Sequence, residues 1–306
     1  MQRYVLNRIL VGVLTLWAVS LLVFGLARVT GDPLEVYLPL EATEEDRARI
    51  AAEWGLDQPI YVQYVRYVWN ILQGDFGGSW RWPGQKALNL ALTRLGASLE
   101  LAAVAVLFSV IVAIPIGVLA AVYKGSALDH AGKAIALLGQ SIPHFWLGIM
   151  LMWIFGVRLG WLPTSGRGTI AHMIMPAVVI GWFSVAALMR LVRSSMLEVL
   201  DSEYIKLARI KGVPERAVIW KHAFRNATIP PLTYFGIMLG FIVVGSITTE
   251  VIFAWPGAGL LIIDAIRARD FQVVQAVALV FAVVFVIISL VVDILYAYLD
   301  PRIRYQ

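Results

Sequence analysis

The sequence predicts an all-α, polytopic membrane protein with six transmembrane helices. Hydrophobic residues make up 60% of the chain and charged residues only 15%, with a mean hydropathy of +0.78. A soluble domain carries about a quarter charged residues, and several apolar runs here reach the roughly 20 residues that a helix needs to cross a bilayer. Helices are expected because each satisfies its own backbone polar groups in lipid. The predicted spans are Ile9–Ala27, Leu101–Val122, Ala134–Val157, Met173–Leu191, Leu232–Thr249 and Val273–Leu299.

The first span, within Met1–Ala27, is expected to remain part of the protein. Its apolar stretch is longer than the core of a typical signal peptide, and no small-x-small cleavage pattern follows at Arg28–Asp32. The sequence therefore predicts an uncleaved helix rather than a cleaved leader.

A long loop follows the first span, and its turn residues predict two helices. Thr43 precedes three acidic residues, which is typical of a helix N-terminus, and Gly55 supplies a stop. The second helix, Ile60–Leu72, ends near Gly74 and is rich in Tyr and Trp, which favour the membrane interface. Residues 1–91 thus form a region with the first span and an amphipathic outer loop, and residues 92–299 form the remaining membrane domain.

The distribution of Lys and Arg predicts that both termini are cytoplasmic. Basic residues flank the first span at Arg3 and Arg8, recur at Lys124 and Lys133, and crowd residues 190–225, whereas the short loops on the other side carry few. Positive loops face the cytoplasm, so the outer loop faces outward. Anionic lipid headgroups account for the net charge of +5, and a nucleic-acid partner is not needed.

No motif in the chain indicates catalysis. A phosphate-binding loop is missing, because Gly132-Lys133 lacks both the upstream glycine and the following hydroxyl residue. No Gly-x-Ser-x-Gly nucleophile motif occurs, and the histidines lack the spacing of metal ligands. These histidines are His130, His144, His172 and His222. We expect no catalytic, cofactor or metal site in this chain.

Asp293 lies deep in the last predicted span and is the main intramembrane candidate. A carboxylate at membrane depth costs about 2.5–3.5 kcal/mol on insertion scales, so it should face protein or water. A polar pair with Arg190 or Arg193 is expected, and a direct part in a substrate path is the alternative. Gln140 and Gln275, near the ends of spans, are further candidates for the path or for contacts between helices.

A polar, basic segment, Glu203–Pro231, separates two very apolar stretches. Asp201 or Ser202 is placed to cap a short helix. Gly212 then ends that helix in the left-handed conformation, and Pro214 suits the first turn of the next one. The segment therefore predicts a helix, a glycine turn and a second helix within a loop at residues 195–230.

The short helix has the features of a docking surface. Ala208 is small enough to lie in a partner's groove, and Tyr204, Ile205 and Ile210 are apolar anchors around it. The basic residues equally favour an amphipathic helix lying on lipid. From the residues alone, both interpretations stay open.

This segment resembles the coupling loop of permease subunits in ATP-binding-cassette (ABC) importers, whose pattern is Glu-Ala-Ala-x-x-x-Gly followed by Leu-Pro or Ile-Pro. Here only Ala208, Gly212 and Ile229-Pro230 match, and the glutamate is absent. The dipeptide/oligopeptide/nickel branch has a pattern closer to Tyr-x-x-x-Ala-Arg-x-Lys-Gly. The matching residues are Tyr204, Ala208, Arg209, Lys211 and Gly212, followed by residues 222–226, His-Ala-Phe-Arg-Asn.

Further stretches along nearly the whole chain are similar to the same branch, and to the first of the two permeases that are typically encoded together. These stretches are Gly31-Asp32-Pro33, Gly55-Leu56-Asp57-Gln58-Pro59, Gly74-Asp75-Phe76-Gly77, Ser141-Ile142-Pro143, Phe145-Trp146-Leu147-Gly148, Leu159-Gly160-Trp161-Leu162-Pro163, Arg193-Ser194-Ser195-Met196, Trp255-Pro256-Gly257 and Leu299-Asp300-Pro301-Arg302.

The resemblance implies a type I ABC importer domain in the inner membrane of a bacterial or archaeal cell. It implies a homologous second permease, two cytoplasmic ATPases that bind ATP and Mg, and an extracytoplasmic solute-binding protein. The residues expected to contact an ATPase are Glu203, Tyr204, Ala208, Arg209, Lys211 and Gly212.

The implied substrate is a dipeptide or oligopeptide. Glutathione, nickel complexes and oligosaccharides are alternatives that the same machinery serves. A six-helix secondary transporter or channel is a more distant alternative, but clear inverted repeats and paired intramembrane charges, which would favour a secondary transporter, are not evident.

Overall fold

The computed structural model describes residues 2–29 and 43–299. The regular structure in these residues is helical, and their one β-type contact is an isolated antiparallel bridge between Gly78 and Lys86. The predicted motif Gly31-Asp32-Pro33 lies outside the described residues, as do residues 300–302 of the C-terminal motif.

Four helices of the described chain are long and apolar enough to cross a membrane by themselves. They are α1 (Gln2–Val29), α5 (Ala87–Val122), α8 (Ile170–Leu200) and α14 (Phe271–Leu299). Two bent segments bring the number of candidate spans to as many as six. One comprises α6 (Ala127–Ser141), α7 (His144–Leu151) and the π-helix η1 (Met152–Arg158), and the other is α12 (Ile229–Ile252).

The predicted third span, Ala134–Val157, is not one continuous helix. Helix α6 ends at Ser141, and the helix that follows is turned by 108°. The break lies at Ile142, which has extended backbone (φ −85°, ψ 122°) before Pro143. A residue before proline is sterically pushed out of the α region, and proline itself has no N–H to donate.

The long segment after α1 contains the two predicted helices. In α3 (Glu44–Trp54), the Thr43 hydroxyl accepts a hydrogen bond from the Asp46 N–H at 3.2 Å, and the Asp46 carboxylate accepts one from the Thr43 N–H at 3.4 Å. Gly55 ends the helix with φ 67°. Helix α4 spans Ile60–Leu72, as predicted.

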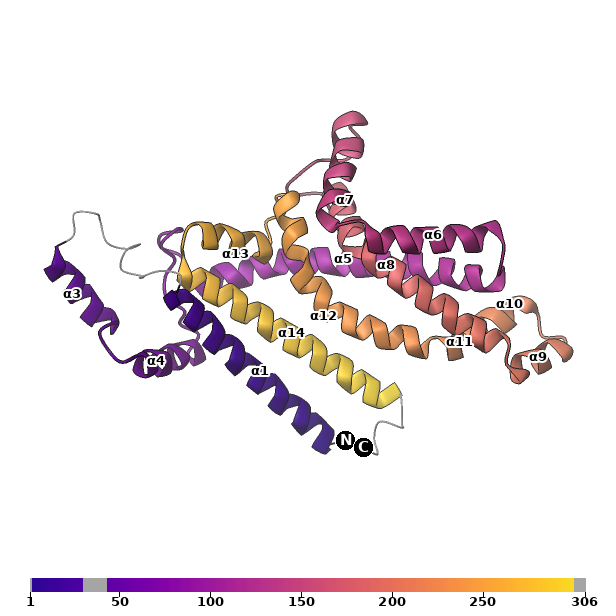
Figure 1. The fold of residues 1–306 in the computed structure, drawn as a ribbon, viewed down its shortest axis with the longest axis horizontal. Coiled ribbons are helices and arrows are strands. Elements are labelled where there is room, and N and C mark those ends of the chain that lie inside the picture. The colour runs from indigo at the N-terminus through magenta and orange to yellow at the C-terminus, as the bar shows by residue number, and fades with distance from the viewer. Residues whose placement is uncertain (1, 30–42, 300–306) are drawn as a thin grey trace. The chain divides into compact units, whose positions relative to one another are not determined.

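The chain divides into two compact units. Unit 1 comprises Met1–Ala97 and Pro256–Gln306, and unit 2 comprises Ser98–Trp255. In unit 1, α1 and α14 run side by side (Figure 1). They approach closely at Gly12, where an added Cβ would lie 2.7 Å from Val286.

A buried carboxylate ties the loop before α5 to the turn before α14 within unit 1. Asp270 accepts hydrogen bonds from the Ser79 hydroxyl at 2.5 Å and from the Arg81 N–H at 3.1 Å. Asp270 also caps α14, because its other oxygen accepts from the Val273 N–H at 3.2 Å. The turn follows α13 (Ala258–Arg267), which packs on α14.

Unit 2 is organised around α8, which packs against α6, α7 and α12 (Figure 1). Of its most apolar window, 56% is buried within the chain, against 22% for α1 and 17% for α14. Helix α8 is therefore an interior helix, whereas α1 and α14 leave most of their apolar surface for lipid or other subunits.

Glycines let α8 approach its neighbours at backbone distance. A Cβ added at Gly117 of α5 would lie 2.8 Å from the Met189 carbonyl oxygen, and one at Gly181 would lie 2.9 Å from the Ala105 carbonyl oxygen. On the side of α6, a Cβ at Gly139 would lie 2.6 Å from the Ala186 side chain. Small residues at such contacts are how helices associate in membranes, where packing must replace the hydrophobic effect.

This packing predicts opposite effects for two identical substitutions in α5. Gly117→Ala should destabilise the purified protein by about 1–3 kcal/mol, because its Cβ has no room against α8. Gly96→Ala should be neutral or stabilising, because nothing lies within 4 Å of its Cβ and alanine is the better helix former. Thermal unfolding in detergent measures both variants, and equal midpoints would contradict the close approach.

Candidate functional site

The predicted basic segment forms a short helical assembly directly after α8. It consists of α9 (Glu203–Ile210), α10 (Glu215–Ala217), the π-helix η2 (Val218–Ala223) and α11 (Phe224–Ala227). Ser202 is the N-cap residue of α9, and Gly212 follows the helix with φ 75°. The predicted glycine turn is thus confirmed, and Pro214 stands at the N-cap of α10 rather than inside its first turn.

One face of this assembly is packed into the core of unit 2. Ile205, Val218 and Ala223 are fully buried and share that core with Met196 of α8. Ala208 is partly buried against the same core, so its small side chain lets α9 lie close to its own chain. The expectation that Ile205 is an anchor for a partner is wrong, because packing inside the subunit covers it completely.

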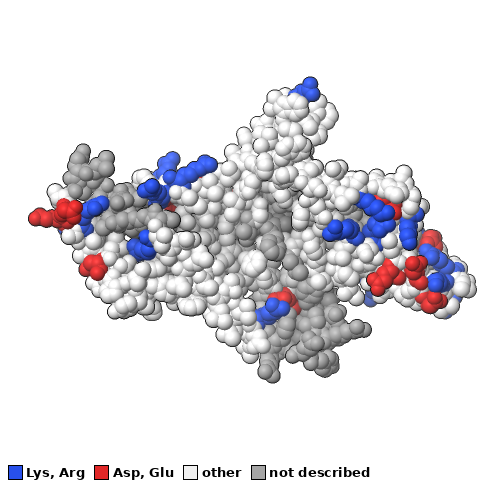
Figure 2. Space-filling view, in the orientation of Figure 1, with Lys and Arg blue, Asp and Glu red and all other residues white. Residues whose placement is uncertain are grey.

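The opposite face of α9 is open and mixes apolar with basic side chains. Tyr204, Leu207 and Ile210 are 44%, 50% and 81% exposed. Leu207 is therefore the exposed apolar residue where the sequence predicted Ile205 to be exposed. Figure 2 shows charged side chains gathered over the end of unit 2 that carries α9 and α10, next to a broad uncharged surface.

An ion pair between Arg209 and Glu215 bridges the turn around Gly212. The Arg209 guanidinium donates two hydrogen bonds to the Glu215 carboxylate, at 2.7 and 3.2 Å. The bond from Arg209 lowers the pKa of Glu215, and the same pairing raises the pKa of Arg209, so both remain charged at neutral pH. On α9 itself, Lys206 donates to Glu203 at 2.8 Å.

The remaining predicted residues of the segment occupy the open side. Lys211 is exposed, and a Cβ added at Gly212 would meet nothing within 4 Å. The Asn226 side-chain amide donates to the Tyr204 hydroxyl at 3.0 Å and thereby joins α11 to α9.

Asp293 pairs with Arg8, and the predicted pairing with Arg190 or Arg193 is wrong. The Arg8 Nε lies 3.1 Å from the Asp293 carboxylate, which joins α1 to α14. Arg190 instead donates to the Gln140 side-chain oxygen at 3.0 Å, and Arg193 binds a different carboxylate, Asp129. Arg8 and Asp293 lie near opposite ends of the sequence, so the sequence alone does not indicate that α1 and α14 bring them together.

The predicted intramembrane polar residues do not form one cluster on α14. Gln275 and Asp293 both lie on this helix, about five turns apart. Within residues 2–29 and 43–299, no group of three or more His, Cys, Asp or Glu residues is arranged to hold a metal ion.

Three buried carboxylates were missed by the sequence-based search, and one of them is Asp270, described above. Asp129 is fully buried in α6, and Glu250 is fully buried in α12, where it accepts hydrogen bonds from Ser98 at 2.6 Å and Ser246 at 2.9 Å. The available signal was the one applied to Asp293, namely an acid within or beside an apolar run. For Asp129, the preceding Ser126 at the helix N-cap was a second signal.

Comparison with known proteins identifies the chain's family. Residues 113–305 match the family described as binding-protein-dependent transport system inner membrane component, and residues 1–83 match the corresponding N-terminal family. The chain belongs to this family. As a binding-protein-dependent permease, it is an inner-membrane subunit of an ABC transport system, and its relatives are transport subunits rather than enzymes.

Relatives match the permease over its full length. It is 41% identical to the glutathione transport system permease protein GsiC of Salmonella paratyphi A over 309 residues, and 37% identical to the oligopeptide transport system permease protein AppB of Bacillus subtilis over 316. It is also 37% identical to the dipeptide transport system permease protein DppB of Escherichia coli K12 over 341 residues. All three alignments cover both chains completely.

A solved structure confirms the fold of the permease. The crystal structure of an amino acid ABC transporter with histidines matches with a TM-score of 0.53 at 15% identity, covering 69% of this chain and 94% of that one. The permease therefore has the fold of a type I ABC importer membrane domain.

The Arg8–Asp293 pair predicts a coupled effect on stability. Arg8→Gln and Asp293→Asn should each lower the thermal midpoint, because each leaves a charge in apolar surroundings. The cost should stay below the about 3–5 kcal/mol of a fully buried pair, because the Arg8 side chain is 45% exposed. The double variant should cost less than the two single effects added together.

A double-mutant cycle on the purified permease measures this coupling. Strictly additive effects would contradict the pairing. Loss of transport by Asp293→Asn with normal stability and assembly would instead favour a role in the substrate path.

Proposed function

We propose that this permease is half of the translocation pathway of an ATP-driven importer of dipeptides or oligopeptides. The observation that carries the proposal is the end-to-end similarity to permeases named for dipeptide, oligopeptide and glutathione transport. The permease pairs with a homologous second permease, two ATPases and an extracytoplasmic solute-binding protein. ATP and Mg bind to the ATPases, and this chain contributes no cofactor site.

In this proposal the permease crosses the membrane six times, with both termini in the cytoplasm. Each bent segment then counts as one span. The concentration of Lys and Arg on the side of α9 supports this orientation, because positively charged loops remain in the cytoplasm. The outer loop with α3 and α4 then faces the solute-binding protein.

The open face of α9 is the contact for an ATPase in this proposal. Tyr204, Leu207 and Ile210 supply apolar anchors, and Arg209 and Lys211 supply charge at the rim. The buried face fixes α9 to the core of unit 2. Closure of the ATPases on ATP therefore pushes a rigidly attached helix, and the membrane helices rock between inward-open and outward-open states.

Glutathione is the second candidate substrate, because GsiC, a permease of a glutathione system, is among the similar relatives. The solute-binding protein sets much of the selectivity of such systems. Uptake of labelled dipeptide, tetrapeptide and glutathione into proteoliposomes that contain the whole complex, with the cognate binding protein supplied, separates the candidates. Uptake of a peptide only in the presence of binding protein and ATP is the expected result.

The ATPase contact predicts that bulk at Gly212 uncouples transport. Gly212→Trp should lower ATP-driven uptake at least about tenfold, because its side chain would project into the open space where the ATPase sits. Gly212→Asn is the matched control, since asparagine tolerates the left-handed conformation of φ 75° without comparable bulk.

Both variants are purified with their partners, and uptake, ATP hydrolysis and retained ATPase are measured. Normal uptake by Gly212→Trp would contradict the contact. Equal loss in Gly212→Asn would trace the effect to the backbone turn.

A further inference from the structure

The α6–α8 interface contains an ion pair between Asp129, which is fully buried, and Arg193, which is partly exposed, and the transport mechanism above does not use it. Building on the proposed role of α9, we propose that Asp129 and Arg193 form a positioning pair that makes α6 move together with α8 and α9. The pair thereby carries the push of the ATPase from α9 to the bent α6–α7 segment.

Asp129 is built into its site by four donated hydrogen bonds. Its carboxylate has no exposed surface and accepts from Arg193 Nε at 2.6 Å and Arg193 Nη2 at 3.0 Å. It also accepts from Lys133 Nζ and from the Gly125 N–H, each at 3.0 Å. A two-point guanidinium–carboxylate contact fixes orientation as well as distance, so it restrains rotation of α6 against α8.

The pair lies close to the ATPase-facing end of α8. Arg193 is about two turns before Leu200, where α8 ends, and α9 begins at Glu203. One turn beyond Arg193, Met196 packs in the same core as Ile205 of α9 and Val218 of η2. The last turns of α8 and the loop are therefore one packed body, and Arg193 is its polar link to α6.

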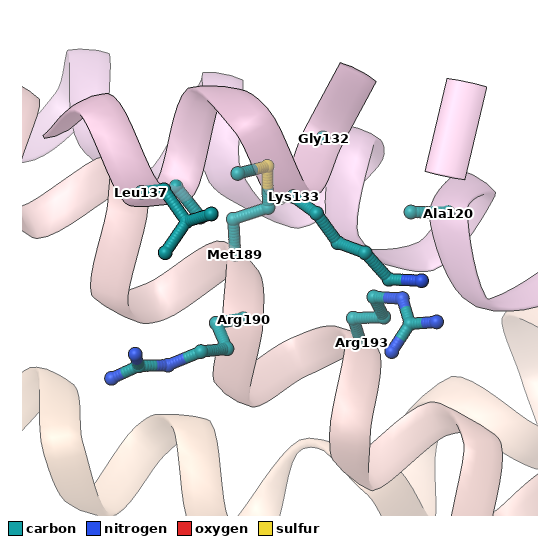
Figure 3. A pocket seen from close by; sticks show the side chains of 8 residues that line it. Ala120, Gly132, Lys133, Leu137, Met189, Arg190 and Arg193 are labelled. Carbon is teal, nitrogen blue, oxygen red and sulfur yellow. The ribbon is translucent and has the colours of Figure 1, made fainter. Parts of the chain in front are cut away.

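The α6–α8 interface is only partly filled beside the ion pair. Farther along, Gly139 and Ala186 bring the two helices into direct contact. Beside the ion pair, however, there is a cavity of about 340 Å³ lined by Gly132, Leu137 and Met189 among others. Figure 3 shows the Lys133 and Arg193 side chains extended toward one another at one side of this cavity, with Arg190 directed away from them.

Stability alone does not require an ion pair at this position. Replacing such a pair with apolar residues of similar size is often neutral or stabilising, whereas removing one partner is costly. Because the chain leads from the end of α6 directly through Pro143 into α7, a fixed α6 passes movement on to the bent segment. A loosened α6 lets α8 and α9 move without it.

The test replaces the pair as a unit. In Asp129→Leu/Arg193→Met, the assembled transporter should keep its thermal midpoint and its bound ATPases and should continue to hydrolyse ATP. Substrate transported per ATP should fall at least about fivefold, the lower end of typical coupling between sites. Arg193→Lys keeps the charge but loses the two-point contact. Its substrate transported per ATP should lie between that of the paired variant and that of wild type.

Lys124→Met is the matched control, because it removes an exposed cation from the same α5–α6 turn without touching the Asp129 network. Its transport per ATP should equal that of wild type. The chain has no cysteine, so spin labels at Leu137→Cys on α6 and Glu198→Cys on α8 can report the distance between the helices. The distribution of distances between the two labels should broaden in Asp129→Leu/Arg193→Met and remain narrow in Lys124→Met.

Each result decides the proposal. Normal transport per ATP in Asp129→Leu/Arg193→Met overturns it, and so does an unchanged label distance. If that variant fails to assemble, Arg193→Lys decides by the same ratio. Normal transport by Gly212→Trp would mean that the proposed ATPase contact is wrong. Uncoupling by Gly212→Trp together with normal transport in the paired variant would leave that contact intact and contradict only the role of Asp129 and Arg193.

Discussion

The close approach of α8 to its neighbours is the constraint on which unit 2 depends. At Gly117, Gly181 and Gly139, a single added carbon would meet backbone or side-chain atoms at under 3 Å. Between apolar helices in lipid, association has to come from such fitted contacts. With α8 held in this way, the segments at its C-terminal end, α9 to α11, acquire a fixed inner face, and α9 presents its outer face in one orientation.

Three carboxylates in the described part of the permease bind partners on their own helix or on an adjacent one. Asp293 joins α14 to α1 through Arg8, and Asp129 joins α6 to α8 through Arg193. Glu250 accepts from Ser98 and Ser246. A buried charge without a partner is costly, so each of these carboxylates has its partners on an adjacent turn or helix. These contacts align helices, and none of them resembles the convergent arrangement that catalysis requires.

Local structure was predictable to within a residue or two where one residue type decides the backbone. The predicted helix start at Thr43 is confirmed by its capping box with Asp46, and the predicted stop at Gly55 and the predicted left-handed turn at Gly212 both have positive φ. The bounds of α4 match the prediction. Proline was less decisive, because α5 continues through Pro115 while the chain turns by 108° at Pro143. Whether a proline bends or breaks a helix depends on the contacts that surround it.

The sequence by itself determined the membrane class, the local caps and turns, and the position of the basic segment, because hydropathy, capping and backbone freedom act over a few neighbouring residues. Only the tertiary structure decided that Asp293 pairs with Arg8, that Ile205 points inward, and that Leu207 lies on the open face of α9. These outcomes depend on which helices pack together and how each is rotated, and side chains far apart in the chain jointly set both.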